Sequence, residues 1–217
     1  MSIILAIETS VSSASIALSK DGELIASQEF ESHRQQNQLL FPALQEILPE
    51  SASDTPDLII VGTGPGSYSG SRISIAAAQG LGIAYQCPVI GLCSYLATPS
   101  ILANNTGYAV GDARRGSFFI APLDSTSVAF SPDLMDEASF IEKTSKLEST
   151  LITFEESLPI SNAKHELPHA SGLIAAWQKL PDSEKEKLEN TPPQPQYLRA
   201  PFITKAKPGH PLLRKKQ

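Results

Sequence analysis

A short pattern of apolar, acidic and small residues occurs twice in this chain, and it limits the folds that the chain can adopt. The two copies read "LAIETSVSSASIAL" (5–18) and "YAVGDARRGSFFIAPL" (108–123). Each begins as an apolar strand that ends in an acidic residue, passes through a turn of small or polar residues, and returns as a second strand. A repeated hairpin of this kind predicts a duplicated fold, in which two α/β lobes enclose a cleft.

The segments around the two hairpins have the periodicity of helices and strands. Asp21-Gly22 predicts a tight turn into a third strand at 24–30, and apolar residues at helical spacing predict a helix at 34–48 that Pro42 kinks or splits. Ser94 is expected to begin a helix that Pro99 disturbs. The other expected elements are strands at 57–62, 89–92, 108–110, 117–123 and 151–154, and helices at 71–85, 137–143, 171–180 and 182–190.

The length and composition are those of a globular protein. The chain has 217 residues, of which 41% are hydrophobic, enough for one large domain or two small lobes with buried cores. We place an N-terminal lobe at 1–105, a smaller C-terminal lobe at 106–190, and a Pro-rich basic tail, expected to be partly mobile, at 191–217.

Charge and cysteine content indicate the compartment and exclude some partners. The formal net charge of −6 argues against nucleic acid as a partner of the whole surface. No apolar run reaches transmembrane length, and the first residues lack the basic start of a signal peptide. Cys87 and Cys93, both in apolar surroundings, are expected to be buried thiols. We therefore expect a cytoplasmic protein with no membrane partner.

A glycine-rich turn at 62–70, "GTGPGSYSG", connects a predicted strand to a predicted helix. Backbone N–H groups at such a helix start can bind an anion. However, no lysine follows as in a P-loop, Pro65 lacks an N–H group, and Tyr68 stands where a nucleophile elbow needs serine. The alternative is a tight turn that requires the backbone freedom of glycine. The sequence leaves these two interpretations equally open.

The helix that follows the turn is built largely of serine, alanine and glycine. Gly80 and Gly82 each lower helix stability by about 1 kcal/mol relative to alanine, which a sequence tolerates where another element packs closely. Small residues cover most of the circumference, whereas packing on the chain's own sheet needs them on one face only. The sequence therefore favours a sheet on one side of this helix and a partner protein on the other.

Polar residues follow both repeated strands and could hold a ligand in the cleft. Acids at the carboxyl ends of strands can bind a metal–nucleotide, but Ser, Thr and Asp side chains also bond the local backbone in turns. His165 and His169 have the i,i+4 spacing of zinc ligands on a helix, but Pro168 argues against a helix there, so a structural role is preferred.

Four segments in this order resemble the bacterial TsaB (YeaZ) family of the threonylcarbamoyladenosine tRNA-modification system. They are "ILAIETS", "VGTGPGSYSGSRISIAAAQGLGIA", "GDARRGSFF" and "PQYLRAP". The match covers roughly the first 125 residues and the short segment near 196. It implies the actin/sugar-kinase/Hsp70-like fold, with two α/β lobes, mixed sheets and internal duplication.

The resemblance also implies a function and its partners. The protein would be a non-catalytic paralogue of the catalytic subunit TsaD, would bind TsaD, and would help to recruit the ATPase TsaE. It would contact tRNA only through that complex and form homodimers when alone. It would need no cofactor of its own and no metal, and ATP or ADP would belong to the assembled complex.

Site residues follow from the same resemblance. The partner interface would use the helices at 34–48 and 71–85, through Leu39, Leu40, Ala43, Ile47, Ser71, Arg72, Ser74, Ile75, Ala78 and Leu81. A vestigial nucleotide or anion cleft would be lined by Glu8, Thr9, Ser10, Gly64, Gly66, Ser67, Asp112, Arg114 and Arg115. No catalytic residue is expected, because the H-x-x-x-H metal motif of TsaD-like subunits has no counterpart near the first helices, where only His33 occurs. The chain departs from the family pattern at Glu8, where aspartate is usual, and at Gln36, where many relatives have histidine.

Two other functions remain as alternatives. A nucleotide-dependent kinase or phosphatase of the same fold would bind Mg-ATP through the cleft acids and the glycine-rich turn. A protease would need a nucleophile–base pair or an H-E-x-x-H site, and neither is evident in the sequence.

Overall fold

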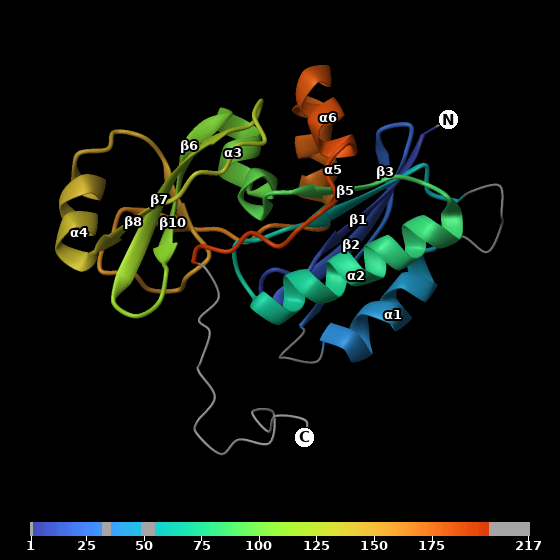
Figure 1. Ribbon diagram of the computed structural model, residues 1–217, viewed down its shortest axis with the longest axis horizontal. Helices are drawn as coiled ribbons and strands as arrows, with labels where there is room; N and C mark the ends of the chain where they lie inside the picture. Colours follow the sequence, from blue (N-terminus) through green and yellow to red (C-terminus); the bar gives the residue numbers. More distant parts are fainter. Residues whose placement is uncertain (1, 32–35, 49–54, 200–217) are drawn as a thin grey trace, which may run out of the picture.

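Two five-stranded mixed sheets form the framework of the protein (Figure 1). The computed structural model describes residues 2–31, 36–48 and 55–199. The first sheet has the strand order β3-β2-β1-β4-β5. Its strands are β1 (Ile3–Glu8), β2 (Ser13–Lys20), β3 (Glu23–Glu31), β4 (Leu58–Gly62) and β5 (Val89–Leu92).

The second sheet repeats the topology of the first. Its strands are β6 (Thr106–Asp112), β7 (Ser117–Asp124), β8 (Asp133–Asp136), β9 (Leu151–Thr153) and β10 (Ala163–His165). Their order is β8-β7-β6-β9-β10, so β6 takes the place of β1. In both sheets the first three strands pair antiparallel, the fourth pairs parallel with the first, and the fifth pairs parallel with the fourth. The predicted duplication and the predicted actin/sugar-kinase/Hsp70-like fold class are therefore confirmed.

Helices cover the sheets unequally in the two lobes. The helices are α1 (Gln36–Ile47), α2 (Tyr68–Tyr85), the 3-10 helix η2 (Ser94–Ala97), α3 (Pro99–Asn104), α4 (Glu137–Ser145), α5 (Ala170–Lys179) and α6 (Asp182–Glu189). α4 follows the third strand of its sheet, as α1 does in the first lobe. Residues 154–162, where a counterpart of α2 would lie, form a loop. Helix α2 is therefore the element that the second lobe does not repeat.

The central strands of the first sheet are buried on both faces. Every residue of β1 and β4 is buried, because α1 and α2 pack on one face and α5 packs on the other (Figure 1). Apolar runs such as Leu58–Gly62 are typical of strands covered in this way. One core fills the space under α1 and α2, and a second joins α5 and η2 to residues of β6 and β7. Helix α5, which was expected in the C-terminal lobe, thus packs on the first sheet.

Proline positions differ in effect from what the sequence suggested. Pro42 does not split α1, which continues to Ile47. Pro42 and Gln38, whose carbonyl group loses its helical partner, are both exposed, so solvent can satisfy that carbonyl group. Pro99 begins α3 at its first position, where its missing N–H group leaves no bond unmade.

The short strands β8 and β10 were not predicted, because the sequence around them lacks clear alternation. The predicted element start at Arg34 lies outside the described residues, as does His33. Helix α6 has no buried residue, as expected for an exposed charged helix. None of the described helices is both long enough and apolar enough to cross a membrane.

The chain that follows α6 returns to the first lobe. We call residues 191–199 the C-terminal strap. Its Gln196 donates a backbone hydrogen bond of 2.9 Å to the carbonyl oxygen of Thr63, and Pro193 packs against Gly91. The predicted tail thus begins with a segment placed on the glycine-rich turn, and residues 200–217 lie outside the described part.

Candidate functional site

The glycine-rich turn packs directly on the backbone that follows β1. A Cβ atom at Gly66 would lie 2.2 Å from the carbonyl oxygen of Ser10, and one at Gly70 would lie 2.0 Å from that of Thr9. The backbone N–H of Ser67 donates a hydrogen bond of 2.6 Å to Ser10. Contacts this short exclude any side chain, so these two glycines are required by packing within the chain.

Several backbone amides of this turn donate hydrogen bonds inside the protein. The N–H groups of Thr63 and Gly64 donate to the Leu92 carbonyl and the Ser94 hydroxyl oxygen, at 2.8 and 3.0 Å. At the start of α2, the N–H groups of Gly70 and Ser71 both donate to Ser67, the N-cap residue. These donors are not available to an anion. This favours the tight-turn interpretation over the phosphate-binding one.

Glu8 ends β1 but does not reach the cleft. Its side chain is fully buried, and its Oε2 atom lies 1.9 Å from where a Cβ atom of Gly62 would stand. Burial raises the pKa of this carboxyl group, and the hydrogen bond of 2.6 Å that Oε1 accepts from the Ser10 N–H offsets this only in part. Glu8, which was expected to line the cleft, instead has its carboxyl group in the core, where Gly62 leaves room for it.

We expect Glu8→Gln to reduce the pH dependence of stability. Because the folded state raises the pKa of Glu8, it favours the protonated form; this contribution is complete below the ordinary pKa of 4.5 and is lost as the pH rises through the folded value. The free energy of unfolding should therefore fall less between pH 5 and pH 8 in the variant than in the wild type. Urea unfolding measures this, with Glu148→Gln, an exposed position, as control. Equal slopes for wild type and Glu8→Gln would contradict the expectation.

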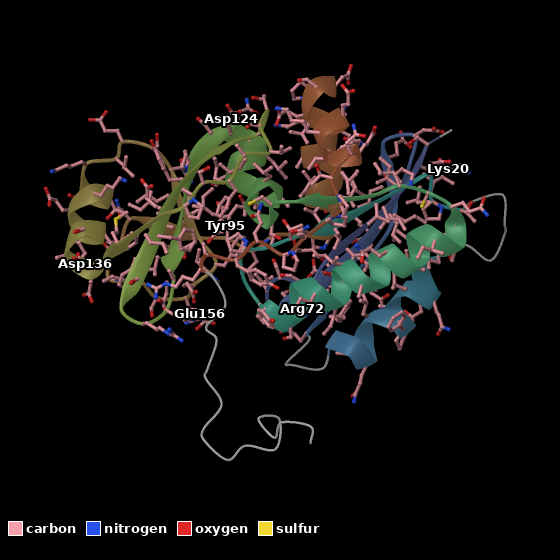
Figure 2. All side chains as sticks on the ribbon, viewed as in Figure 1. Lys20, Arg72, Tyr95, Asp124, Asp136 and Glu156 are labelled. Carbon is pink, nitrogen blue, oxygen red and sulfur yellow. The ribbon has the colours of Figure 1, made fainter. Side chains whose placement is uncertain are left out.

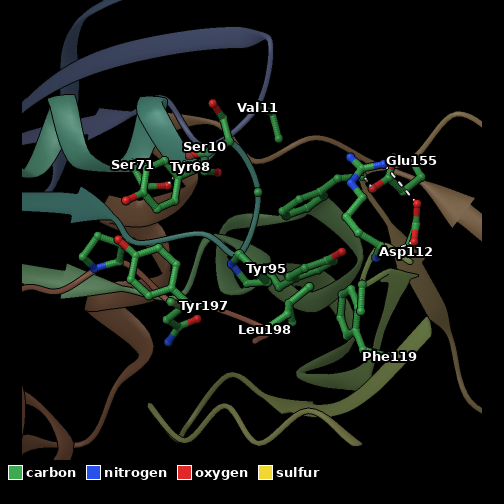
Figure 3. A pocket seen from close by; sticks show the side chains of 18 of the residues that line it. Ser10, Val11, Tyr68, Ser71, Tyr95, Asp112, Phe119, Glu155, Tyr197 and Leu198 are labelled. Carbon is green, nitrogen blue, oxygen red and sulfur yellow. Dashed lines mark hydrogen bonds and ion pairs between the residues drawn. The ribbon is translucent and has the colours of Figure 1, made fainter. Parts of the chain in front are cut away.

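A pocket of about 560 Å³ lies between the lobes, and we call it the interlobe pocket. Figure 3 shows Ser10, Tyr68 and Ser71 on one side of it, with Asp112, Phe119 and Glu155 across from them. Of the predicted cleft residues, Ser10, Gly66, Ser67, Asp112 and Arg114 line it. The others, Glu8, Thr9, Gly64 and Arg115, are not among its lining residues.

The acidic residue at the end of β6 is hydrogen-bonded within the turn that follows it. Asp112 accepts hydrogen bonds from the backbone N–H and the side chain of Arg114, at 2.6 and 3.0 Å. The Arg114 guanidinium group also lies 3.9 Å from the Glu155 carboxylate. In the same turn, Arg114, Arg115 and Gly116 all have positive φ angles. These exposed ion pairs add at most about 1 kcal/mol to stability. Asp112 is therefore engaged in turn chemistry, as the alternative interpretation of the sequence proposed.

Aromatic rings form the floor and the mouth of the pocket. Tyr95 stacks on Phe154 with ring centroids 3.8 Å apart and meets Phe119 edge-on. At the mouth, Tyr68 and Tyr197 stack at 5.5 Å (Figure 3). Sequence reasoning missed these rings as pocket residues, although "PQYLRAP", which contains Tyr197, was already singled out.

The structure divides the predicted partner-interface residues between core and surface. Six are buried: Leu40, Ala43, Ser71, Ser74, Ile75 and Ala78. Arg72 is exposed, and Leu39, Ile47 and Leu81 are half-buried. These six side chains have little surface for a partner, so the exposed and half-buried residues are better placed for a contact. The contact itself stays a prediction.

A different stripe of α2 is accessible, and we call Arg72, Ala76, Gly80 and Ile83 its outer face. All four are exposed, Ile83 at 81%, and a Cβ atom at Gly80 would have nothing within 4 Å. Their spacing places them on one side of the helix. Phe41 of the adjacent α1 is also 54% exposed. Figure 2 labels Arg72 near the first residues of α2, of which Tyr68 and Ser71 line the interlobe pocket.

The two histidines of interest have separate positions. His169 caps α5: its Nδ1 accepts a hydrogen bond of 3.1 Å from the Ser171 N–H, and its Nε2 lies 2.9 Å from Glu29. His165 belongs to β10 and lines the interlobe pocket. Within the described ranges no three His, Cys, Asp or Glu side chains are grouped as metal ligands would be.

Comparisons with known proteins agree on one group of relatives. The family model "TsaD: tRNA N6-adenosine threonylcarbamoyltransferase" matches residues 24–126. The tRNA threonylcarbamoyladenosine biosynthesis protein TsaB of Escherichia coli K12 is 27% identical over 95% of this chain and 98% of its own. TsaB of Buchnera aphidicola (subsp. Baizongia pistaciae) is 35% identical over 105 residues, 47% of each chain.

A solved structure supports the fold. YeaZ from Pseudomonas aeruginosa superposes with a TM-score of 0.65 at 24% identity, over 91% of this chain and all of its own. At this identity the likeness bears on the fold alone. Taken together, these matches confirm the resemblance to the TsaB (YeaZ) family that the four sequence segments predicted.

Proposed function

We propose that this chain, a relative of TsaB (YeaZ) proteins over almost its whole length, takes part in tRNA threonylcarbamoyladenosine biosynthesis. We assign it the role of a non-catalytic subunit that binds a TsaD-like catalytic protein, helps to recruit a TsaE-like ATPase, and meets tRNA through that complex. It would work in the cytoplasm and form homodimers when alone.

The observation that carries this proposal is the outer face of α2. An apolar side chain as large as Ile83 at 81% exposure, beside an open Gly80, leaves a smooth surface that another helix can approach closely. Helix α2 also has no counterpart in the second lobe. Its inner face packs on the first sheet, and a partner contact would give its exposed outer face a function.

The state of the cleft supports the absence of catalysis. The N–H groups of Thr63, Gly64 and Ser67 are bonded within the chain, and the carboxyl group of Glu8 is buried. Asp112 is engaged by Arg114. A chain with these groups already occupied would supply shape to the complex and leave the chemistry to its partner.

Light scattering on the purified chain, alone and mixed with the TsaD-like protein of the same organism, tests this proposal. We expect a homodimer that exchanges into a mixed complex. Ala76→Arg places a long cation in the middle of the outer face. It should weaken both assemblies by at least about tenfold, because the interface would desolvate a positive charge that has no acidic group to pair with.

The matched control is Ala138→Arg, the same substitution at an exposed position of α4 in the other lobe. It should leave both assemblies unchanged. A chain that stays monomeric and does not bind the TsaD-like protein would overturn the proposal. Equal effects of the two variants would show that the outer face of α2 is not the contact surface.

A nucleotide-dependent kinase or phosphatase is the second candidate, and the interlobe pocket of about 560 Å³ is the observation that favours it. Such an enzyme would bind Mg-ATP tightly without any partner and would lose that binding on Asp112→Ala. Calorimetric titration of the isolated chain with Mg-ATP separates it from the scaffold role.

A further inference from the structure

We propose that the last five residues of the C-terminal strap, 195–199, form a latch that closes the interlobe pocket and opens without unfolding of either lobe. The stack of Tyr197 on Tyr68 of α2 holds the latch closed. The proposal concerns the isolated chain, so it can be tested independently of the partner contact at the outer face of α2.

The first half of the strap is anchored to the first lobe. Helix α6, which precedes it, packs on β5, and the Thr191 N–H donates a hydrogen bond of 3.1 Å to the carbonyl oxygen of Leu188. Pro193 is buried and packs against Gly91 of β5. These contacts fix the point from which the latch can move.

Exposed and half-buried contacts hold the latch itself. The Gln196 N–H donates a hydrogen bond of 2.9 Å to the carbonyl oxygen of Thr63, and the ring centroids of Tyr197 and Tyr68 lie 5.5 Å apart. Tyr197 is 45% exposed, and no residue of 194–199 is buried. A segment that buries so little surface opens locally at a much lower free energy than that of global unfolding.

Proline favours a segment that opens and closes again readily. Pro192, Pro193 and Pro195 lack an N–H group, which leaves fewer main-chain hydrogen bonds to break when the latch opens. Their rings also restrict the backbone of the open segment, so less conformational entropy is lost when it closes.

The ring on which the latch closes is held in place. Tyr68 is the first residue of α2, and the guanidinium carbon of Arg72, one turn further along, lies 5.0 Å from its ring centroid. Arg72 also donates a hydrogen bond to the Tyr68 hydroxyl group. The stack therefore joins a ring fixed on a helix to a ring on a segment without regular secondary structure.

The closed latch completes the interlobe pocket. All five of its residues line the pocket, and Leu198 also packs against the core that joins α5 and η2 to β6 and β7 (Figure 3). When the latch opens, the pocket loses this wall. The latch thus controls access to the space between the lobes.

Amide hydrogen exchange of the isolated chain, measured by NMR, tests the proposal, because the Gln196 N–H is bonded to Thr63 only while the latch is closed. After correction for intrinsic rates, we expect Gln196 to exchange at least about fivefold more slowly than in a peptide of residues 191–199. It should exchange at least about 100-fold faster than Ile60 in the middle of β4.

Low concentrations of urea separate local opening from global unfolding. Up to about 1 M urea should leave the exchange of Gln196 nearly unchanged and accelerate that of Ile60, because local opening exposes little surface. Equal rates for Gln196 and Ile60 would mean that the strap opens only with the lobe. Exchange of Gln196 at the rate of the peptide would mean that the latch is not closed. Either result would overturn the proposal.

Variants of the two tyrosines test the stack. Tyr197→Ala should raise the exchange rate of Gln196 about three- to tenfold, the effect of losing one aromatic pair. Tyr197→Phe keeps the ring and is the matched control, with a rate within about twofold of the wild type. Tyr68→Ala should act as Tyr197→Ala does, and the double variant should add little, because both changes remove the same contact.

Both tyrosines are exposed, so these variants should fold as the wild type does. An unchanged rate in Tyr197→Ala would show that the stack does not hold the strap. Full additivity of the two single effects would show that the two rings act separately. Each of these results would refute the latch.

Discussion

Replacing Gly70 by alanine should destabilise the protein by about 3 kcal/mol or more, although alanine is the better helix former. The reason is the backbone that follows β1. The new Cβ atom would stand 2.0 Å from the carbonyl oxygen of Thr9, whose hydroxyl group also donates to the Gly70 carbonyl oxygen at 2.8 Å. Neither backbone can move without pulling α2 away from the first sheet. Denaturant unfolding would measure the loss.

Gly80 provides the matched control within the same helix. It lies ten residues further along α2, in open space, so Gly80→Ala should stabilise the protein by about 0.5–1 kcal/mol. Opposite signs for one substitution at two positions of one helix would separate packing from propensity. If Gly70→Ala were as stable as the wild type, the close contact between the turn and Thr9 would be refuted.

The second large effect is expected from arginine at Ala78. This residue is fully buried in the core under α2, so Ala78→Arg would place an unpaired charge among aliphatic side chains. Breaking a buried charge pairing typically costs about 3–5 kcal/mol, a large part of a total stability of about 5–15 kcal/mol. We expect Ala78→Arg to be unfolded or largely insoluble, with no thermal transition in circular dichroism.

Ala76→Arg, two positions earlier, should have a free energy of unfolding within about 0.5 kcal/mol of the wild type, because residue 76 is exposed to solvent. This comparison also determines how partner binding is tested. Loss of the complex in Ala78→Arg would result from unfolding of the chain. Loss of the complex in the folded Ala76→Arg variant would show that the outer face of α2 contacts the partner. A folded Ala78→Arg protein would mean that the helix is turned relative to the sheet.

The two lobes of the internal repeat differ in one helix. Both lobes keep the five-stranded sheet, since each strand needs its neighbours for backbone hydrogen bonds. Only the first lobe keeps a helix after the fourth strand, and that helix carries an exposed apolar face. The difference between the lobes therefore coincides with the surface that we propose for partner binding.

Most helices and strands, and the duplicated fold, could be predicted from the sequence because they depend on local patterns. Alternating apolar residues, Asp21-Gly22 and the acid-ended strands specify the hairpins through short-range turn geometry and side-chain periodicity. The glycine-rich turn was also located correctly, because glycine at close contacts is a strong local pattern. The brief strands β8 and β10 had no comparable pattern, so their pairing depends on neighbours that are distant in sequence.

What only the tertiary structure decided is which side of α2 is buried and where Glu8 points. Ala76 and Ala78 are chemically identical, and a helix of serine, alanine and glycine has nearly the same hydrophobicity on every side. The larger side chains of the sheet beneath it select the buried face. For Glu8, the space left by Gly62, more than fifty residues away in the sequence, admits the carboxyl group to the core. Such long-range packing carries no local pattern, so the sequence alone could specify the turn and the helix but not the surface they present.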